Sequence, residues 1–266
     1  LVGNRIAGGP SCRRNGGAAM NGLKIISNIA RRELSAYFES PVAYVFLVIF
    51  LLLAGVFTFT IGGFFLRGEA SLIAFFSFMP WLFLFLVPAI GMRLWSEERR
   101  MGTIELLLTM PVTTWQAIVG KFLASWIFIA IALALTFPFI ITVNWLGNPD
   151  NGVIATGYIG CLLLGGAYLS LASMTSALTR NQVVSFIIAV VLCLLLILAG
   201  FTPVTDLLSR WASPAVIEAI AGFSVLTHFY EFQKGMVDSR NLLYFLSVIG
   251  FALFTTGVII RNQRAG

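Results

Sequence analysis

Long apolar runs without a charged side chain constrain this sequence more than any other feature. Residues 75–92 contain no charged side chain, and residues 122–147 contain none either. An uncharged apolar run of about 18 residues or more is long enough to cross a bilayer as a helix. Hydrophobic residues make up 59% of the chain and charged residues 11%, so little of it is left for a water-soluble domain. The sequence therefore predicts an all-α integral membrane protein.

Six apolar runs are expected to span the membrane. Their approximate limits are 42–66, 71–94, 115–146, 153–178, 182–200 and 241–260. The third run is longer than a bilayer requires and is expected to begin in the cytoplasm. None of the runs carries an ionisable residue in its middle, where ion and proton pathways usually have one, so a proton- or sodium-coupled transporter is disfavoured. Energy for transport would then come from outside the membrane part.

The basic residues predict the orientation. With the N-terminus inside, cytoplasmic segments hold thirteen Lys and Arg residues and outer segments hold four. Short cytoplasmic loops of membrane proteins are enriched in basic residues, so both termini are predicted to lie in the cytoplasm. The membrane is expected to be the cytoplasmic (inner) membrane of a bacterium. The same clustering makes nucleic acid a poor explanation for the net charge of +6.

The N-terminal part divides into two segments. Residues 1–19 are rich in glycine and lack hydrophobic periodicity, so we expect a disordered leader, native or added, ahead of one membrane domain over 20–266. Residues 21–40 have the apolar spacing of an amphipathic helix, which Pro41 would end. Such a helix is expected to lie in the plane of the membrane interface. Its polar side includes the candidate site residues Arg31 and Arg32, which Glu33 follows.

The charged segment over 97–113 separates the second span from the third. Residues 97–101 are expected to continue the second span out of the bilayer, and Gly102 to end that helix in a left-handed conformation. Thr113 and Gln116 have the spacing of a capping box and are expected to begin the third span.

Between these two ends, a short helix is predicted over 104–110. Thr103 is expected to cap it, Glu105 lies in its first turn where the helix dipole favours a carboxylate, and Pro111 would end it. This helix is expected to lie along the membrane face and contact another protein. The simpler alternative is an ordinary cytoplasmic loop.

A set of residues in and around this segment forms a specific pattern. The set is Glu98, Gly102, Thr103, Glu105, Leu107, Leu108, Pro111, Val112, Gly120 and Lys121. It resembles the coupling-helix signature of permease subunits of ABC transporters, and more narrowly that of the type V exporter class, which includes the gliding-motility permeases. In that family the segment docks into a groove on a separate ATPase subunit. The resemblance implies this coupling role for Glu98, Gly102, Thr103, Ile104, Glu105, Leu107, Leu108 and Pro111.

The resemblance also implies partners. They are two copies of a cytoplasmic ABC ATPase subunit and a second permease, either another copy of this chain or a homologue. This sequence has no G-x-x-x-x-G-K-[ST] loop, so ATP and Mg²⁺ would be bound by the ATPase, and the chain would not be an enzyme by itself. Glu98 and Glu105 are expected to hold the corner of the coupling segment together through basic or backbone donors.

Residues 201–240 are expected to form an outer-side hairpin between the fifth and sixth spans. A helix, a break around Pro214 and a second helix would dip into the membrane, and Trp211 belongs to the apolar face. The resembled family has a re-entrant hairpin at this position. His228 is the only histidine, and beside aromatic neighbours it is interpreted as an interface residue rather than a metal ligand or a base.

Other features receive structural interpretations. Gly166, Ser170, Ser173 and Ala177 form a stripe of small residues that favours close helix packing. Pro80, Pro88 and Pro138 lie inside predicted spans and are interpreted as static kinks, with hinges as the alternative. No group of residues has the spacing of a metal site.

Two functions follow from these expectations. The first is the permease of an ATP-driven exporter that moves a lipid-like, polymeric or peptide substrate, with membrane lipids around it. The alternative is a membrane anchor that transmits force in an ABC-driven machine of the cell envelope, together with a periplasmic protein. A membrane-embedded enzyme is disfavoured, because no nucleophile, base and orienting group come together within the spans.

Overall fold

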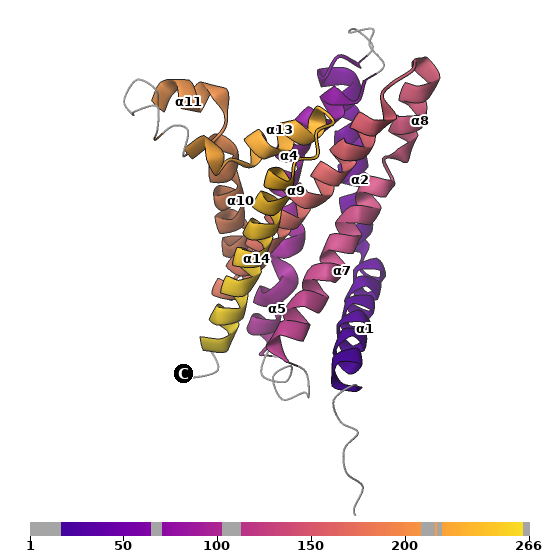
Figure 1. Ribbon diagram of the computed structural model, residues 1–266. Helices are drawn as coiled ribbons and strands as arrows, with labels where there is room; N and C mark the ends of the chain where they lie inside the picture. The colour runs from indigo at the N-terminus through magenta and orange to yellow at the C-terminus, as the bar shows by residue number, and fades with distance from the viewer. Residues whose placement is uncertain (1–16, 65–70, 103–112, 209–215, 217–219, 263–266) are drawn as a thin grey trace, which may run out of the picture.

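The structure is a computed structural model that describes residues 17–64, 71–102, 113–208, 216 and 220–262 (Figure 1). Every regular element within these residues is a helix. The elements are α1 (Gly17–Glu39), α2 (Pro41–Gly55), the π-helix η1 (Val56–Ile61), α4 (Ile73–Gly91), α5 (Arg93–Met101), α7 (Thr114–Ala134), α8 (Phe137–Leu146), α9 (Asn151–Leu178), α10 (Gln182–Leu198), α11 (Thr202–Leu208), α13 (Val225–Gln233) and α14 (Ser239–Asn262).

Five helical stretches are long and apolar enough to cross a membrane. They are Pro41–Ile61, Ile73–Met101, Thr114–Leu146, Asn151–Leu178 and Ser239–Asn262. A sixth candidate consists of α10 and α11, which are bent by 71° relative to each other at a short break. The all-helical membrane class is confirmed. Five of the six predicted spans are confirmed as single candidates, and the fifth predicted run, 182–200, corresponds to α10, the first helix of the bent pair.

Two of the spans are interrupted inside the bundle. The second span breaks at Met92, between α4 and α5, and the third breaks at Leu135 and Thr136, between α7 and α8. Pro138 lies in the first turn of α8, where a missing N–H leaves no helical bond unmade. By contrast, Pro80 and Pro88 lie inside α4. The interpretation of the three prolines as static kinks, with hinges as the alternative, stays a prediction.

The helix α9 forms the centre of the bundle, where it packs against α4, α5, α7, α10, α13 and α14 (Figure 1). Small residues allow this close packing. A Cβ added to Gly91 of α4 would clash with Cβ of Ala172 on α9. The whole predicted stripe is also buried on α9: Gly166, Ser170, Ser173 and Ala177. The interpretation of these residues as a packing surface is therefore confirmed.

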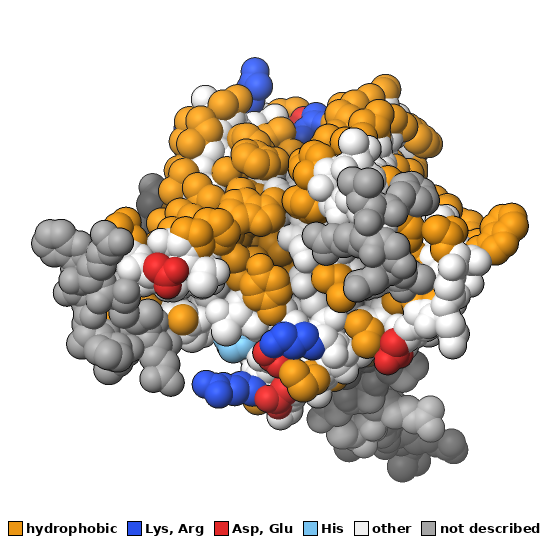
Figure 2. All heavy atoms as spheres, turned by 90° about the horizontal axis from the view of Figure 1, so that it is seen from above, with side chains coloured by type: hydrophobic (Ala, Val, Ile, Leu, Met, Phe, Trp, Pro, Cys, Tyr) orange, Lys and Arg blue, Asp and Glu red, His pale blue; other side chains and the backbone are white. Residues whose placement is uncertain are grey.

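Charged side chains are distributed unequally between the two ends of the bundle. The C-terminal ends of α5, α9 and α14 and the start of α7 lie at one end, at the bottom of Figure 1. We call it the basic end, because nine of the eleven described Lys and Arg residues lie on its side. The other two of these eleven described residues, Lys234 and Arg240, lie near the opposite end. Seen from the opposite end, the molecule exposes hydrophobic side chains around much of its periphery (Figure 2). A cytoplasmic position of the basic end stays a prediction.

The first helix runs beside α7 over the part of α7 nearest the basic end. Its contacts advance along both helices in the same direction: a Cβ added to Gly120 would meet Ile29, and Tyr37 reaches Ser125. The two helices are therefore packed in parallel, and α1 lies below α2 in Figure 1. The axis of α1 therefore runs along the bundle, in the direction of α7. The predicted position of the helix in the interface plane stays a prediction.

Candidate functional site

Both ends of the predicted coupling segment are described, and both have the expected geometry. Gly102 follows α5 in the left-handed conformation, with a φ of 70°, and its N–H donates to the carbonyl oxygen of Glu98. At the start of α7, the N–H of Gln116 donates to Oγ1 of Thr113 at 3.3 Å, and the N–H of Thr113 donates to Oε1 of Gln116 at 3.0 Å. The left-handed stop and the capping box are confirmed.

The part between these ends lies outside the described residues. It contains six of the predicted coupling residues: Thr103, Ile104, Glu105, Leu107, Leu108 and Pro111. The predicted short helix and the basic or backbone donors expected for Glu105 belong to the same part. The short helix and the donors for Glu105 therefore stay predictions.

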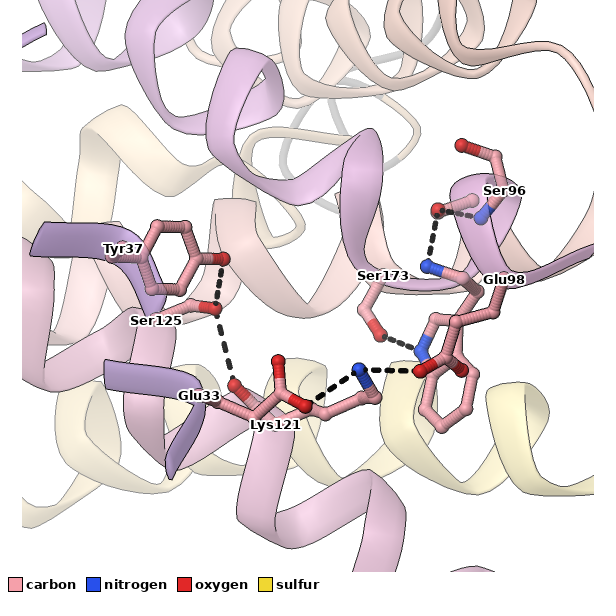
Figure 3. Close-up of polar contacts among 9 residues, drawn as sticks. Glu33, Tyr37, Ser96, Glu98, Lys121, Ser125 and Ser173 are labelled. Carbon is pink, nitrogen blue, oxygen red and sulfur yellow. Dashed lines mark hydrogen bonds and ion pairs between the residues drawn. The ribbon is translucent and has the colours of Figure 1, made fainter. Parts of the chain in front are cut away.

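An ionic junction joins three helices at the base of this segment (Figure 3). Nζ of Lys121, on α7, lies 2.9 Å from Oε1 of Glu98 on α5 and 3.2 Å from Oε1 of Glu33 on α1. The Lys121 side chain is 7% exposed, whereas the two carboxylates are 20% and 22% exposed. The basic partner expected for Glu98 is therefore Lys121. We call Glu33, Glu98 and Lys121 the ionic junction.

The position of Lys121 in its helix explains why a charge is tolerated there. A buried ammonium is costly unless acceptors surround it, and here two carboxylates accept from it while Nζ lies 5.7 Å from the ring centroid of Trp95. The stretch Thr114–Leu146 has 33 residues and is about 50 Å long, against a hydrocarbon core of about 30 Å. Lys121 lies two turns from the start, close to the basic end.

A neutral contact beside the junction holds α1 against α7. The hydroxyl groups of Tyr37 and Ser125 lie 2.9 Å apart, and the ring of Tyr37 stacks on Phe128 with 5.3 Å between centroids. Burial raises the pKa of the Tyr37 hydroxyl above its ordinary value, so this group keeps its proton at neutral pH. The ionic junction and this contact together fasten two successive turns of α1 to α7.

Serine side chains of α9 hold α5 at the break between α4 and α5. Oγ of Ser176 accepts hydrogen bonds from the backbone N–H groups of Trp95 and Ser96, each at 3.0 Å, and donates to the carbonyl of Met92 at 2.8 Å. Ser173 accepts from Nε1 of Trp95 at 3.0 Å. The break leaves backbone groups without helical partners, and α9 supplies them. As a result, α5 is fixed to the centre of the bundle.

The predicted residues of the first helix have different surroundings. Arg31 and Arg32 are exposed, whereas Glu33 is partly buried in the ionic junction. The pairing of Glu33 with Lys121 was not anticipated, although Lys121 belongs to the family signature. One sequence signal pointed to it: a single Lys within an otherwise apolar helix requires an acidic partner.

Of the three residues predicted for the outer hairpin, the structure describes His228, which lies toward the opposite end. Trp211 and Pro214 fall outside the described residues. Nδ1 of His228 lies 2.7 Å from Oδ1 of Asn241, Nε2 lies 3.1 Å from the carbonyl of Gly222, and the ring stacks on Tyr244 at 4.0 Å. His228 is buried on α13 and packs against α14. Within the described residues, no group of three His, Cys, Asp or Glu residues could hold a metal ion.

Comparison with known families gives one result that covers most of the chain. A family model described as "ABC-2 family transporter protein" matches residues 27–253. A search of curated proteins gave no match. The matched region begins inside α1, includes the ionic junction and both ends of the coupling segment, and ends within α14. This chain therefore belongs to the ABC-2 family of transporter proteins.

Proposed function

We propose that this chain is the permease subunit of an ATP-driven exporter of the type V class, closest to the gliding-motility permeases, and that a separate ATPase drives it through residues 102–111. Membership of the ABC-2 family supports a permease that works with an ABC ATPase. The observation that carries the proposal is the ionic junction, because it fastens α1, α5 and α7 together where the coupling segment leaves and rejoins the bundle.

In this mechanism, closure of two ATPase subunits on ATP and Mg²⁺ displaces the coupling segments of two permeases. A push on residues 102–111 reaches α5 through Gly102 and α7 through Thr113. Since Ser173 and Ser176 bind α5 to α9, the displacement passes to the centre of the bundle instead of bending one loop. The substrate would be lipid-like, polymeric or a peptide, and transport would run outward across the bacterial inner membrane.

The proposal is tested by purifying the chain in mild detergent from its host, identifying its companions by mass spectrometry and measuring ATP hydrolysis. We expect an ATPase with a phosphate-binding loop at equal stoichiometry. Glu105→Lys should lower ATP hydrolysis by the complex while leaving membrane insertion intact, because it reverses a charge in the coupling segment.

The matched control is Glu231→Lys, which makes the same charge reversal at the opposite end. There Oε1 of Glu231 forms a surface ion pair with Nζ of Lys234, at 3.3 Å. It should leave hydrolysis unchanged. Purification of the chain without an ATPase in several detergents, or equal activity of Glu105→Lys and the parent complex, would contradict the proposal.

A further inference from the structure

A cavity of about 420 Å³ lies beside the ionic junction, between α1, α2, α4, α5 and α7. Its size falls in the range of small-ligand sites. Neither the coupling role nor the family assignment gives it a function. Val42 of α2 lines the cavity and is 56% exposed, so the cavity is open to the surroundings along α2.

The walls of this cavity have two chemically different parts. Ala43, Phe46, Ile90 and Phe128 supply an apolar part from α2, α4 and α7. A polar part comes from α1, α5 and α7 and contains the titratable side chains Glu33, Tyr37, Arg93, Glu97, Glu98 and Lys121. A ligand that matches both parts is an amphiphile with a polar head and a hydrocarbon chain.

The charges of the lining select the kind of head group. Three carboxylates face two cations, so the lining carries one net negative charge. Both cations already have acidic partners: Lys121 contacts Glu33 and Glu98, and Nε of Arg93 lies 3.4 Å from Oε2 of Glu97. The net negative charge of the lining repels a head group that is itself net negative, whereas an ammonium group can add to the carboxylates. Arg93 is 38% exposed and is suited to a phosphate that accompanies the ammonium.

A path for the hydrocarbon chain begins at the same opening. Exposed apolar side chains of α2 recur at helical spacing from the cavity outward: Val42, Val45, Ile49 and Leu52, between 43% and 60% exposed. Ten residues of helix separate the first from the last, which corresponds to about 15 Å. An acyl chain can therefore lie along this stripe while its head group occupies the polar part of the cavity.

We propose that this cavity binds a membrane phospholipid with a primary amine head group, of the phosphatidylethanolamine type. The ammonium donates hydrogen bonds to carboxylates that include Glu97, the phosphate lies against Arg93, and one acyl chain follows the exposed stripe of α2. Bound in this way, the lipid contacts every helix of the ionic junction. The proposal is independent of the direction and substrate of transport.

The test measures lipid binding without any transport or ATPase readout. The purified chain in detergent is titrated with dioleoyl phosphatidylethanolamine, phosphatidylcholine or phosphatidylglycerol, and bound lipid is counted by native mass spectrometry. Phosphatidylethanolamine should bind most tightly. Glu97→Gln should weaken its binding about tenfold, because one charge-assisted hydrogen bond is lost. Ala36→Phe and Ala89→Phe, which place a ring in the cavity without changing its charge, should abolish binding.

Glu39→Gln is the matched control, because Glu39 is exposed on the same helix as Glu33 and does not line the cavity. It should bind phosphatidylethanolamine as the parent does. Three results would overturn the proposal: equal or tighter binding of phosphatidylglycerol or phosphatidylcholine, unchanged binding in both phenylalanine variants, or equal weakening by Glu39→Gln and Glu97→Gln. Each of these results would leave the proposed permease function untouched.

Discussion

At the basic end, α1, α5 and α7 meet through one ammonium and two carboxylates, whereas at the opposite end α13 and α14 meet through neutral groups around His228. Both contacts are largely buried, but the ionic junction reaches from α7 back to α1, whereas the contact around His228 joins two consecutive helices. The ionic junction lies where the coupling segment leaves the bundle. The contact around His228 lies where the chain turns between its last two described helices.

The difference between the two ends shows how position in a membrane protein selects the chemistry of a contact. An ammonium and its carboxylates require a site near water and lipid head groups, because full burial costs several kcal/mol per ion. The neutral groups around His228 bear a smaller desolvation cost and fix one arrangement. In the proposed mechanism, the ionic junction fastens α1, α5 and α7 beside the coupling segment, while the contact around His228 holds α13 against α14.

The largest effect is expected for Lys121→Met, which breaks the ionic junction. Two partly buried carboxylates then face each other without their shared cation, and the bundle should lose about 3–5 kcal/mol of stability. Unfolding by SDS in mixed micelles, followed by tryptophan fluorescence, measures this loss. The triple variant Glu33→Gln, Glu98→Gln, Lys121→Met should recover part of it. A single variant as stable as the parent would show that the junction does not hold the three helices.

A smaller loss is expected for His228→Ala at the opposite end. The substitution removes the stacking on Tyr244 and leaves Asn241 without its buried partner, at a cost of about 1–3 kcal/mol. The same SDS titration measures it. ATP hydrolysis by the complex should be unchanged, unlike in Lys121→Met. Equal loss of hydrolysis in both variants would remove the functional distinction between the ends.

The connection from the basic end to the centre of the bundle is tested by Ser176→Ala. Two backbone N–H groups of α5 lose their partner, which should cost about 1–2 kcal/mol, while the carbonyl of Met92 still accepts from the Ser96 hydroxyl. Ser170→Ala is the matched control, since the buried Ser170 hydroxyl donates to the carbonyl of Ala167 in its own helix, at 2.8 Å, and bonds to no other helix among the described residues. Thermal unfolding in detergent compares the two. Similar midpoints would argue against α9 as the support of α5.

The smallest effect on stability is expected for Glu97→Gln, on the same helix as Glu98. Its pair with Arg93 is about 40% exposed and spans one helical turn, and such pairs contribute about 0.3–0.5 kcal/mol. Thermal unfolding at low and high salt should therefore give nearly the same midpoint for this variant and the parent. A drop comparable to that of Lys121→Met would place Glu97 inside the ionic junction.

Local patterns in the sequence predicted the parts of the site that depend on neighbouring residues. The stop at Gly102 and the capping box of Thr113 and Gln116 involve residues at most four positions apart, so residue type and spacing were sufficient. The small residues of α9 recur at spacings of three and four, and this local pattern predicted close helix packing. The bend between α10 and α11 lies at the end of the predicted fifth span, 182–200, where the separate segment over 201–240 was expected to begin.

By itself, the sequence determined the membrane class, the approximate spans and the unequal distribution of basic residues, because bilayer thickness and helix geometry translate directly into run length and charge. The tertiary structure decided which acidic residues surround Lys121 and that α1 runs parallel to α7. It also decided that serines of α9 hydrogen-bond the backbone groups exposed at the break before α5. These contacts join residues separated by about 80 positions or more, with the Glu98 pair the exception. Helix packing brings such residues together, and no local pattern records which faces will meet.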